Sequence, residues 1–326
     1  MKKTLFALLL LVPHMTAMLA QDGVTFELIR GIENGTVKSK IESETTKLLT
    51  MLNERQSDNK DDLSFKGISI TEEAKQTILL LWKFQHMRVW QDVEGEEPYI
   101  AETCLRFGRK GYQVRNIPMR LYPVENNGED DDYTEICINY DLSGNIVDFN
   151  ITMAKQQYQD ILKSAINVED EYNRMVIAHL MEQLRTAYNQ KNLQFFKDIF
   201  SEDAIIITGV RKFRLEKTEA RIKDQAKYEY NVSTKAQYVE SLSRVFKKNN
   251  VINVVFGNDA KYKRDGSARY YMVDVTQYWN SSTYSDEGRL FLLWDFNDPD
   301  NPQILVRAWQ HTDDDKHFSF KDFKLP

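Results

Sequence analysis

Few residues in this chain have the type and spacing needed for acid–base or metal chemistry. Four histidines follow residue 20, namely His86, His179, His311 and His317, and none belongs to an HExxH pattern. His179 falls on the apolar stripe of a predicted helix and could reach a pocket as a base, although a structural histidine is the more common outcome. His311 and His317 flank three aspartates that could hold a metal, but a solvated charged tail explains this stretch better.

A second group of oxygen ligands lies between Asp295 and Asp300. The spacing suggests a calcium loop, but Asp300 and Val306 stand where an EF-hand needs its glycine and its bidentate glutamate. We therefore expect a turn and no metal. The GxSxG, P-loop and dinucleotide patterns do not occur in the sequence, which predicts neither catalytic residues nor a cofactor.

The segment 286–310 predicts the β-hairpin around which the second half is built. Two period-two runs flank a turn that contains two prolines and two aspartates. Ile304, Val306 and Ala308 are expected to share one face. Since both faces are largely apolar, one should pack on helices while the other meets a second apolar body or lines a cavity.

Aromatic and arginine side chains on the predicted strands are the candidates for binding. Core packing is the default role of such aromatic residues. The alternative is a pocket lining or a partner-binding sheet face with an arginine at its rim. The candidate ligand- or partner-binding residues are Tyr278, Arg289, Trp294, Arg307 and Trp309.

Length and composition limit the class of protein. A chain of 326 residues favours two domains, and 42% hydrophobic residues can form their cores. The net charge is −6 and no stretch concentrates Lys and Arg. Because binding to phosphates requires clustered basic residues, we exclude nucleic acid as a partner.

The N-terminus predicts a cleaved bacterial signal peptide at residues 1–20. Lys2 and Lys3 precede an apolar run at 5–12, and small residues follow around Ala17 and Ala20. The run is too short to span a bilayer, so an uncleaved anchor is the weaker alternative. No cysteine follows it, so we expect no lipid anchor. The mature chain is therefore expected to be periplasmic or secreted, with no membrane span.

The two cysteines, Cys104 and Cys137, fall on predicted strands of the first half. An oxidising compartment permits a disulfide. In a simple meander, however, another strand would separate the two cysteines, which favours two buried free thiols. Both alternatives stay open at this point.

The two halves predict the same order of elements: helix, capped helix, strands and a closing hairpin. Helices are expected at 31–56, from a capping box at 69–72 through Trp82, and then as a broken pair over 175–200 and from 235 onward. Strands are expected at 99–107, 112–122, 133–140, 146–153, 204–208, 252–262, 269–279, 288–296 and 304–310. A charged excursion or lid is expected at 211–229. This order suggests an internal duplication.

These elements predict an α+β chain with a leader, two domains, a connector and a tail. The first domain covers 21–155 and is a possible diverged repeat of the second. A polar connector covers 156–171, the second domain covers 172–311, and a charged tail at 312–326 is expected to be loose.

The segment MEQLRTAYNQKNLQFFKDIFSEDAIIITG at 181–209 resembles the start of the nuclear transport factor 2-like superfamily, which includes ketosteroid isomerases and polyketide cyclases. The matching features are a polar step at 189–192, Phe200, and the pair Glu202 and Asp203 before a strand. The resemblance implies a cone-shaped domain in which a strongly curved antiparallel sheet wraps around helices and a pocket. The first half resembles the superfamily only in its order of elements.

The catalytic pair of the isomerases does not carry over to this sequence. Their helix tyrosine falls on Leu184, and their general-base aspartate falls on Thr208. Leucine cannot donate a hydrogen bond, and threonine is no base near neutral pH.

We therefore expect an exported, non-enzymatic binding or scaffold protein of the cell envelope. Its partner would be a small apolar ligand or an envelope protein, and two copies could pair through a sheet face. The alternative is an enzyme, a cyclase, isomerase or hydrolase, with a different set of residues in the second-domain pocket.

Overall fold

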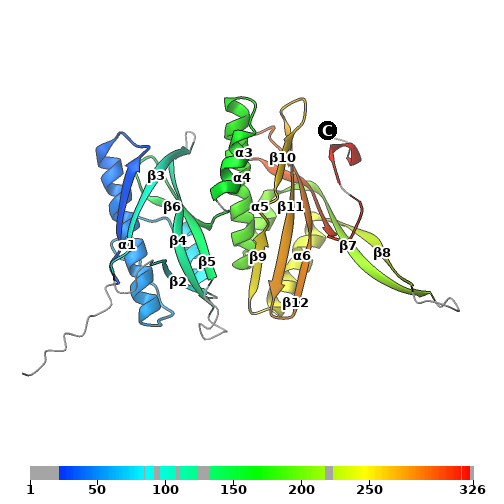
Figure 1. The fold of residues 1–326 in the computed structure, drawn as a ribbon, viewed down its shortest axis with the longest axis horizontal. Coiled ribbons are helices and arrows are strands. Elements are labelled where there is room, and N and C mark those ends of the chain that lie inside the picture. Colours follow the sequence, from blue (N-terminus) through cyan, green and yellow to red (C-terminus); the bar gives the residue numbers. More distant parts are fainter. Residues whose placement is uncertain are drawn as a thin grey trace, which may run out of the picture.

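The computed structural model describes residues 22–83, 85–91, 96–107, 111–123, 132–153, 155–216, 223–316 and 318–323. These residues form six α-helices and two separate curved sheets of six and seven strands (Figure 1). The predicted α+β fold class with one sheet in each half is confirmed. The predicted leader at 1–20 and His317 lie outside the described residues.

The first sheet belongs to residues 25–151. Its elements are β1 (Thr25–Arg30), α1 (Gly35–Ser57), α2 (Glu72–Trp82), β2 (Gln85–Val89), β3 (Tyr99–Phe107), β4 (Gly111–Pro123), β5 (Asp132–Tyr140) and β6 (Ile146–Ile151). The strand order is β1-β3-β4-β5-β6, and β2 also pairs with β4. Strand β1, which the sequence did not predict, runs parallel to β3.

The second sheet belongs to residues 200–311. Its elements, with the helices that precede it, are α3 (Lys155–Lys163), α4 (Val168–Asn189), α5 (Leu193–Ile199), β7 (Phe200–Glu216), β8 (Lys223–Thr234), α6 (Lys235–Lys248), β9 (Ile252–Phe256), β10 (Lys261–Arg264), β11 (Tyr270–Ser281), β12 (Tyr284–Asp295) and β13 (Gln303–His311). The order is β10-β11-β12-β13-β7-β8, and β9 also pairs with β11. Helix α3 and the start of α4 occupy most of the stretch 156–171 that the sequence predicted to be a polar connector.

The two sheets share one pattern of pairing. In the first sheet, β2 and β3 pair with different parts of β4, and in the second sheet β9 and β10 pair with different parts of β11. Beyond these strands, the first sheet continues with antiparallel β5 and β6, and the second with antiparallel β12 and β13. Strand β13 pairs in parallel with β7, and β6 makes one parallel bridge between Ile146 and Ile70. The repeated order of elements, which suggested a duplication, is therefore accompanied by a repeated pattern of strand pairing.

Side-chain caps begin both helices that precede the strand runs. Thr71, and not the predicted Ser69, caps α2 by accepting a hydrogen bond from the Ala74 amide. Thr234 and Gln237 form the predicted capping box at the start of α6. Lys191, with φ of 58°, turns the chain between α4 and α5. The predicted break between the two helices is therefore confirmed.

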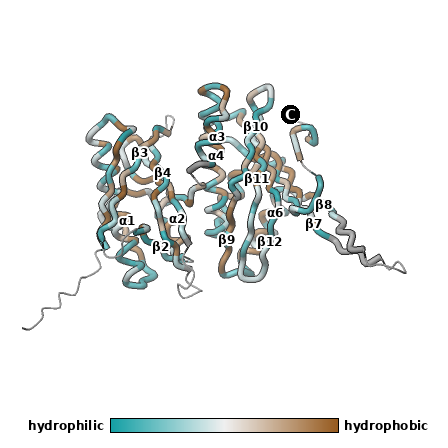
Figure 2. The backbone as a smooth tube through the Cα atoms, viewed as in Figure 1, coloured by the Kyte–Doolittle hydropathy of each residue, from teal (hydrophilic) through white to brown (hydrophobic). Residues whose placement is uncertain are grey.

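Helix α4 lies between the two sheets (Figure 1). One side contributes Ile177, Met181 and Leu184 to the apolar core under the second sheet. The other side turns polar residues toward β4, β5 and β6 of the first sheet. Helix α1 packs on the opposite, apolar face of that sheet, and the hydrophobic stretches in Figure 2 follow these buried layers.

A β-bulge changes the predicted faces of β13. Leu293 pairs with Val306 while the next residue, Trp294, pairs with Ile304, so Leu305 is the extra residue. Ile304 consequently belongs to the helix-side core, whereas Val306 and Ala308 point to the opposite face. The prediction that these three residues share one face is wrong because alternation is interrupted at the bulge. Arg307 is thereby placed on the same side of the sheet as Ile304.

Two further expectations differ from the structure. The described parts of the charged stretch at 211–229, expected to be an excursion or lid, are paired strands: 211–216 belongs to β7 and 223–229 to β8. Residues 318–323 of the tail, which was expected to be loose, lie on the outer face of the second sheet, where Phe318 is buried beside Phe291. Apolar residues between the charges explain this second difference.

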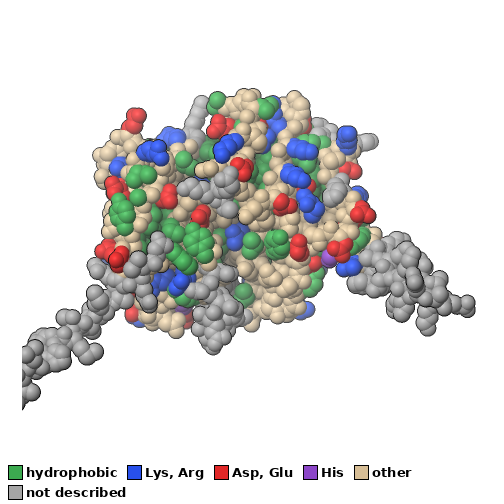
Figure 3. All heavy atoms as spheres, viewed as in Figure 1, with side chains coloured by type: hydrophobic (Ala, Val, Ile, Leu, Met, Phe, Trp, Pro, Cys, Tyr) green, Lys and Arg blue, Asp and Glu red, His purple; other side chains and the backbone are tan. Residues whose placement is uncertain are grey.

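Charged side chains of both signs are interspersed on the face of the molecule shown in Figure 3. Among the described helices, none combines the length and apolar character that a membrane span requires.

Candidate functional site

A cavity of about 760 Å³ opens between α6 and the inner face of the second sheet. This volume lies in the range of small-molecule pockets in proteins. The lining residues come from β7, α6 and the loop after it, β11, β12 and β13: Thr208, Gly209, Val210, Arg211, Tyr238, Leu242, Val245, Lys248, Asn249, Gln277, Trp279, Ser281, Thr283, Tyr284, Asp286, Arg307, Trp309 and His311.

Three polar side chains of this lining are buried: Gln277, Asn249 and Arg307, which are 2%, 4% and 7% exposed. The Arg307 guanidinium lies 5.0 Å from the centre of the Tyr238 ring. Arg307 Nε and Gln277 Oε1 are buried, and neither has a hydrogen-bond partner among the described residues. Buried polar atoms in proteins are normally paired, so these two atoms leave hydrogen-bonding capacity beside the cavity.

The end of the cavity beside Arg307 and Tyr238 is called its enclosed end. Neighbouring hydroxyl groups and burial determine the protonation states there. Tyr188 and Tyr238 are joined through their hydroxyls at 2.6 Å. Burial raises the pKa of Tyr238 well above its ordinary value, so the phenol stays neutral. Burial alone would lower the pKa of Arg307, but Tyr188 and Tyr238 raise it, so the guanidinium stays charged. The enclosed end therefore offers one cation and neutral hydrogen-bonding groups.

Two indole rings, Trp279 and Trp309, contribute aromatic surface to the cavity wall. Trp279 contacts the Tyr188 ring edge-on, with centroids 5.6 Å apart. Trp309 lies against Gly288, where an added Cβ would come within 2.4 Å of the indole ring and 2.3 Å of the Gln310 carbonyl oxygen. Only glycine at position 288 leaves room for Trp309 as placed.

The outer part of the lining carries charges of both signs. Asp286 lies 3.8 Å from the nearest nitrogen of His311, and both residues line the cavity. Burial and the hydrogen bond to Asp286 raise the pKa of Tyr284 to about 12. Arg211 is exposed and pairs with Asp313 at 3.3 Å. Asp286 and His311 are half-buried, in contrast to the buried Arg307.

The structure brings together two of the five candidate residues named from the sequence. Arg307 and Trp309 line the cavity, whereas Trp294 is fully buried in the helix-side core. Arg289 bonds to Asp274 at 2.8 Å, and Tyr278 is 38% exposed; neither of them lines the cavity.

Sequence reasoning missed Gln277, Tyr238 and Gly288. Gln277 is a polar residue inside an otherwise apolar and aromatic strand, which is a signal that could have identified it. Tyr238 looks like an ordinary core position of an amphipathic helix. Nothing in the sequence distinguishes Gly288 from a turn glycine.

The structure also shows where the two positions lie that correspond to the catalytic pair of the isomerases. Leu184 is buried in the core, and Thr208 lines the cavity. A leucine packed in the core and a threonine hydroxyl do not supply the donor and the base of that reaction.

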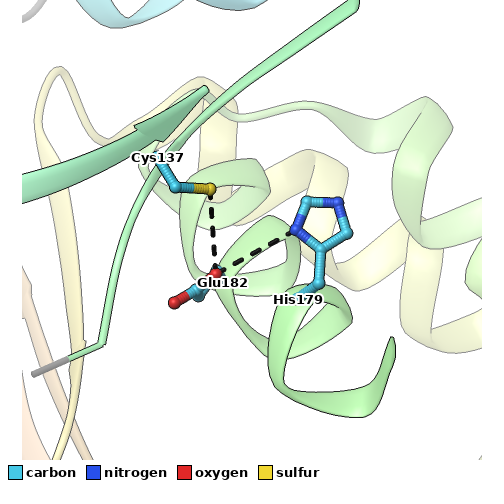
Figure 4. A group of neighbouring side chains, drawn as sticks. All are labelled: Cys137, His179 and Glu182. Carbon is cyan, nitrogen blue, oxygen red and sulfur yellow. Dashed lines mark hydrogen bonds and ion pairs between the residues drawn. The ribbon is translucent and has the colours of Figure 1, made fainter. Parts of the chain in front are cut away.

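A second cluster of chemically active residues lies at the boundary between the two halves. Figure 4 shows Cys137 of β5 facing His179 and Glu182 of α4. The Cys137 Sγ lies 3.9 Å and the His179 Nδ1 4.0 Å from Glu182 Oε2. All three residues are buried, and their potential ligand atoms lie within 4.8 Å of one another.

A buried ion pair between Glu182 and Arg115 explains this cluster better than a metal site does. Its guanidinium donates to both oxygens of Glu182, and the Met153 amide donates to Oε1 at 2.9 Å. Burial also raises the pKa of Cys137 well above its ordinary value, so the thiol stays protonated. A cation would have to displace Arg115 and deprotonate this thiol. Both Cys104 and Cys137 are buried and free, and no disulfide joins them.

A comparison with protein-family models finds no match, and a comparison with curated proteins finds none either. Similar solved structures include Bd1075 of Bdellovibrio bacteriovorus, with 11% identity and a TM-score of 0.33, covering 52% of this chain and 50% of that one. The chain thus spans about half the length of Bd1075.

Two further similar structures are nuclear transport factor 2-like proteins. The protein of Cytophaga hutchinsonii has 14% identity and a TM-score of 0.32, and the match covers 45% of this chain and 99% of that one. The protein of Salmonella enterica has 10% identity and a TM-score of 0.32, covering 43% and 90%. Many of the similar structures are nuclear transport factor 2-like proteins, in agreement with the resemblance predicted from the sequence.

Proposed function

We propose that this chain is a binding protein whose second domain takes up a small, largely apolar organic molecule in the cavity beneath α6. The observation that carries the proposal is a pair of buried polar atoms, Arg307 Nε and Gln277 Oε1, that have no hydrogen-bond partner among the described residues and lie beside a cavity walled by two indoles. Apolar walls with a few oriented polar groups are typical of small-molecule sites.

The chemistry of the enclosed end favours binding over catalysis. A general base must accept a proton near neutral pH. At this end, Arg307 stays protonated and Tyr238 stays neutral. A molecule held there meets donors and aromatic surface but no base.

Mass spectrometry of the protein purified from its native cells tests this function. The protein is denatured after purification and the released small molecules are identified. Thr208→Trp would place an indole in the cavity and should abolish the bound molecule, whereas Tyr278→Trp, outside the cavity, should retain it. The same small molecule on both variants, or none on the wild-type protein, would contradict the proposal.

One observation favours a second candidate function, an enzyme. His311 and Asp286 line the outer part of the cavity as an acid–base pair and could act on a group that extends from the enclosed end. Incubating the identified ligand with wild-type protein and His311→Gln decides between the two. Turnover that His311→Gln abolishes would establish the enzyme, and an unchanged ligand would favour the binding protein.

We also propose that the chain acts in the cell envelope, on the strength of the leader pattern at residues 1–20. Fractionation of cells should find the mature chain outside the cytoplasm, and removal of residues 2–20 should retain it inside.

A further inference from the structure

The groups at the enclosed end narrow the class of ligand, provided that the cavity binds a small molecule as proposed above. We infer that the ligand is an organic acid whose carboxylate pairs with Arg307 and whose apolar body lies along Trp279 and Trp309. This inference specifies the chemical class that the proposed function leaves open.

The charge of Arg307 is the first step. Its side chain is buried at 7% exposure, and no described Asp or Glu lies within ion-pair distance of it. A buried charge without an opposite charge is unfavourable, and a guanidinium matches a carboxylate with two parallel hydrogen bonds. The contact with the Tyr238 ring offsets only part of this cost, because a ring face is not an anion.

The number of cations decides between classes of anion. Arg307 is the sole cationic side chain among the described residues that is both buried and part of the cavity lining. The other cations of the lining are Arg211, which is exposed and paired with Asp313, and Lys248 at the end of α6. One guanidinium balances the single charge of a carboxylate, whereas a phosphate monoester would carry about −1.5 to −2 charges into the same site.

Gln277 supplies a second polar group further along the lining. Through Gly288 it lies opposite His311, whereas Arg307 pairs with Leu292 of the same strand β12. Its Oε1 has no hydrogen-bond partner among the described residues, and rotation of the amide by half a turn presents an N–H in its place. The amide can therefore donate to or accept from a polar group on the body of the ligand, while Arg307 holds the carboxylate.

Calorimetric titration with matched probes tests the inference. The probes are 2-naphthoate, its neutral amide 2-naphthamide, and 2-naphthyl phosphate, with decanoate and decanamide as a flexible pair. On the wild-type chain, each carboxylate should bind at least about tenfold more tightly than its amide. Arg307→Met should remove this preference, and Arg307→Lys should keep part of it.

Arg289→Met is the matched control, because this arginine lies on the same sheet outside the cavity. It should leave the preference unchanged, and circular dichroism should show that all variants are folded. Amides that bind as tightly as carboxylates would overturn the inference while leaving the proposed function intact. Preferential binding of the phosphate would overturn the carboxylate assignment, and a failure of every probe to bind would overturn both proposals.

Discussion

The guanidinium of Arg307 lies over the ring of Tyr238, 5.0 Å from its centre, and so ties β13 to α6 across the enclosed end of the cavity. A side chain that could have paired with a carboxylate of the protein is held against an aromatic face. The hydrogen-bonding capacity of its Nε is left for whatever occupies the cavity.

Replacing Gly288 with alanine should damage the cavity wall. The new Cβ would lie 2.4 Å from the Trp309 ring and 2.3 Å from the Gln310 carbonyl oxygen, so both must move. Overpacking of this kind destabilises a protein by about 1–3 kcal/mol, and the displaced indole should also weaken ligand binding. Urea unfolding and calorimetric titration measure the two effects.

Gly35→Ala is the matched control, because a Cβ at that position meets no atom within 4 Å and the residue begins α1. Its stability should stay within about 0.5 kcal/mol of the wild type, since it changes a surface position. Equal effects of the two substitutions would contradict the role of Gly288.

The buried pair of Arg115 and Glu182 should be a major tie between the two halves. Glu182→Gln leaves the Arg115 charge buried beside Tyr158, whose ring centre lies 3.9 Å from the guanidinium. We expect a loss of about 3–5 kcal/mol in the free energy of unfolding, measured in urea.

Two comparisons sharpen this measurement. Glu240→Gln breaks the exposed pair with Arg244 and should change stability by less than about 0.5 kcal/mol. The double variant Arg115→Met with Glu182→Met removes both charges and should be more stable than Glu182→Gln. A loss in the double variant that equals the sum of the losses in Arg115→Met alone and Glu182→Met alone would show that the two side chains do not act as a pair.

Acid should weaken the same boundary through Asp148. Burial opposes its ionisation, but hydrogen bonds from His179, Asn150 and Gln183 hold the pKa of Asp148 below its ordinary value. The folded state therefore binds the proton less readily than the unfolded state, so the contribution to stability is present above about pH 4 and is lost as pH falls. Asp148→Asn should be less stable than the wild type at pH 7 and should approach it near pH 3. Parallel stability curves for the two proteins would contradict this expectation.

The C-terminal segment should keep the outer face of the second sheet from associating. Phe318 and Phe323 contact Phe291 there, with ring centroids 6.2 and 5.6 Å apart. Removing residues 317–326 exposes this apolar face, and exposed apolar faces promote association. The truncated chain should sediment as a larger species than the full chain, whereas removal of 324–326 alone should not change sedimentation. Identical sedimentation of all three would show that the segment has no such role.

The sequence predicted the final hairpin and its two buried faces because alternation and turn residues are local signals. It did not predict the bulge at Leu305, since one extra residue leaves no mark in a run that is apolar on both faces. That bulge decides that Arg307, named from the sequence for its type, faces the cavity. Gln277 and Tyr238 reach the same cavity from other elements, so their proximity is a property of the tertiary fold. The same holds for the polar side of α4, where His179 and Glu182 are buried against a sheet from the other half.

The most direct test of the carboxylate site is nuclear magnetic resonance of the Arg307 Nε–H group during titration. Adding 2-naphthoate to the ¹⁵N-labelled chain should shift this resonance progressively as the cavity fills, and adding 2-naphthamide should shift it far less, because only the carboxylate offers an anionic acceptor. An Arg307 Nε–H resonance that stays in place while calorimetry shows the carboxylate saturating its site would contradict the account.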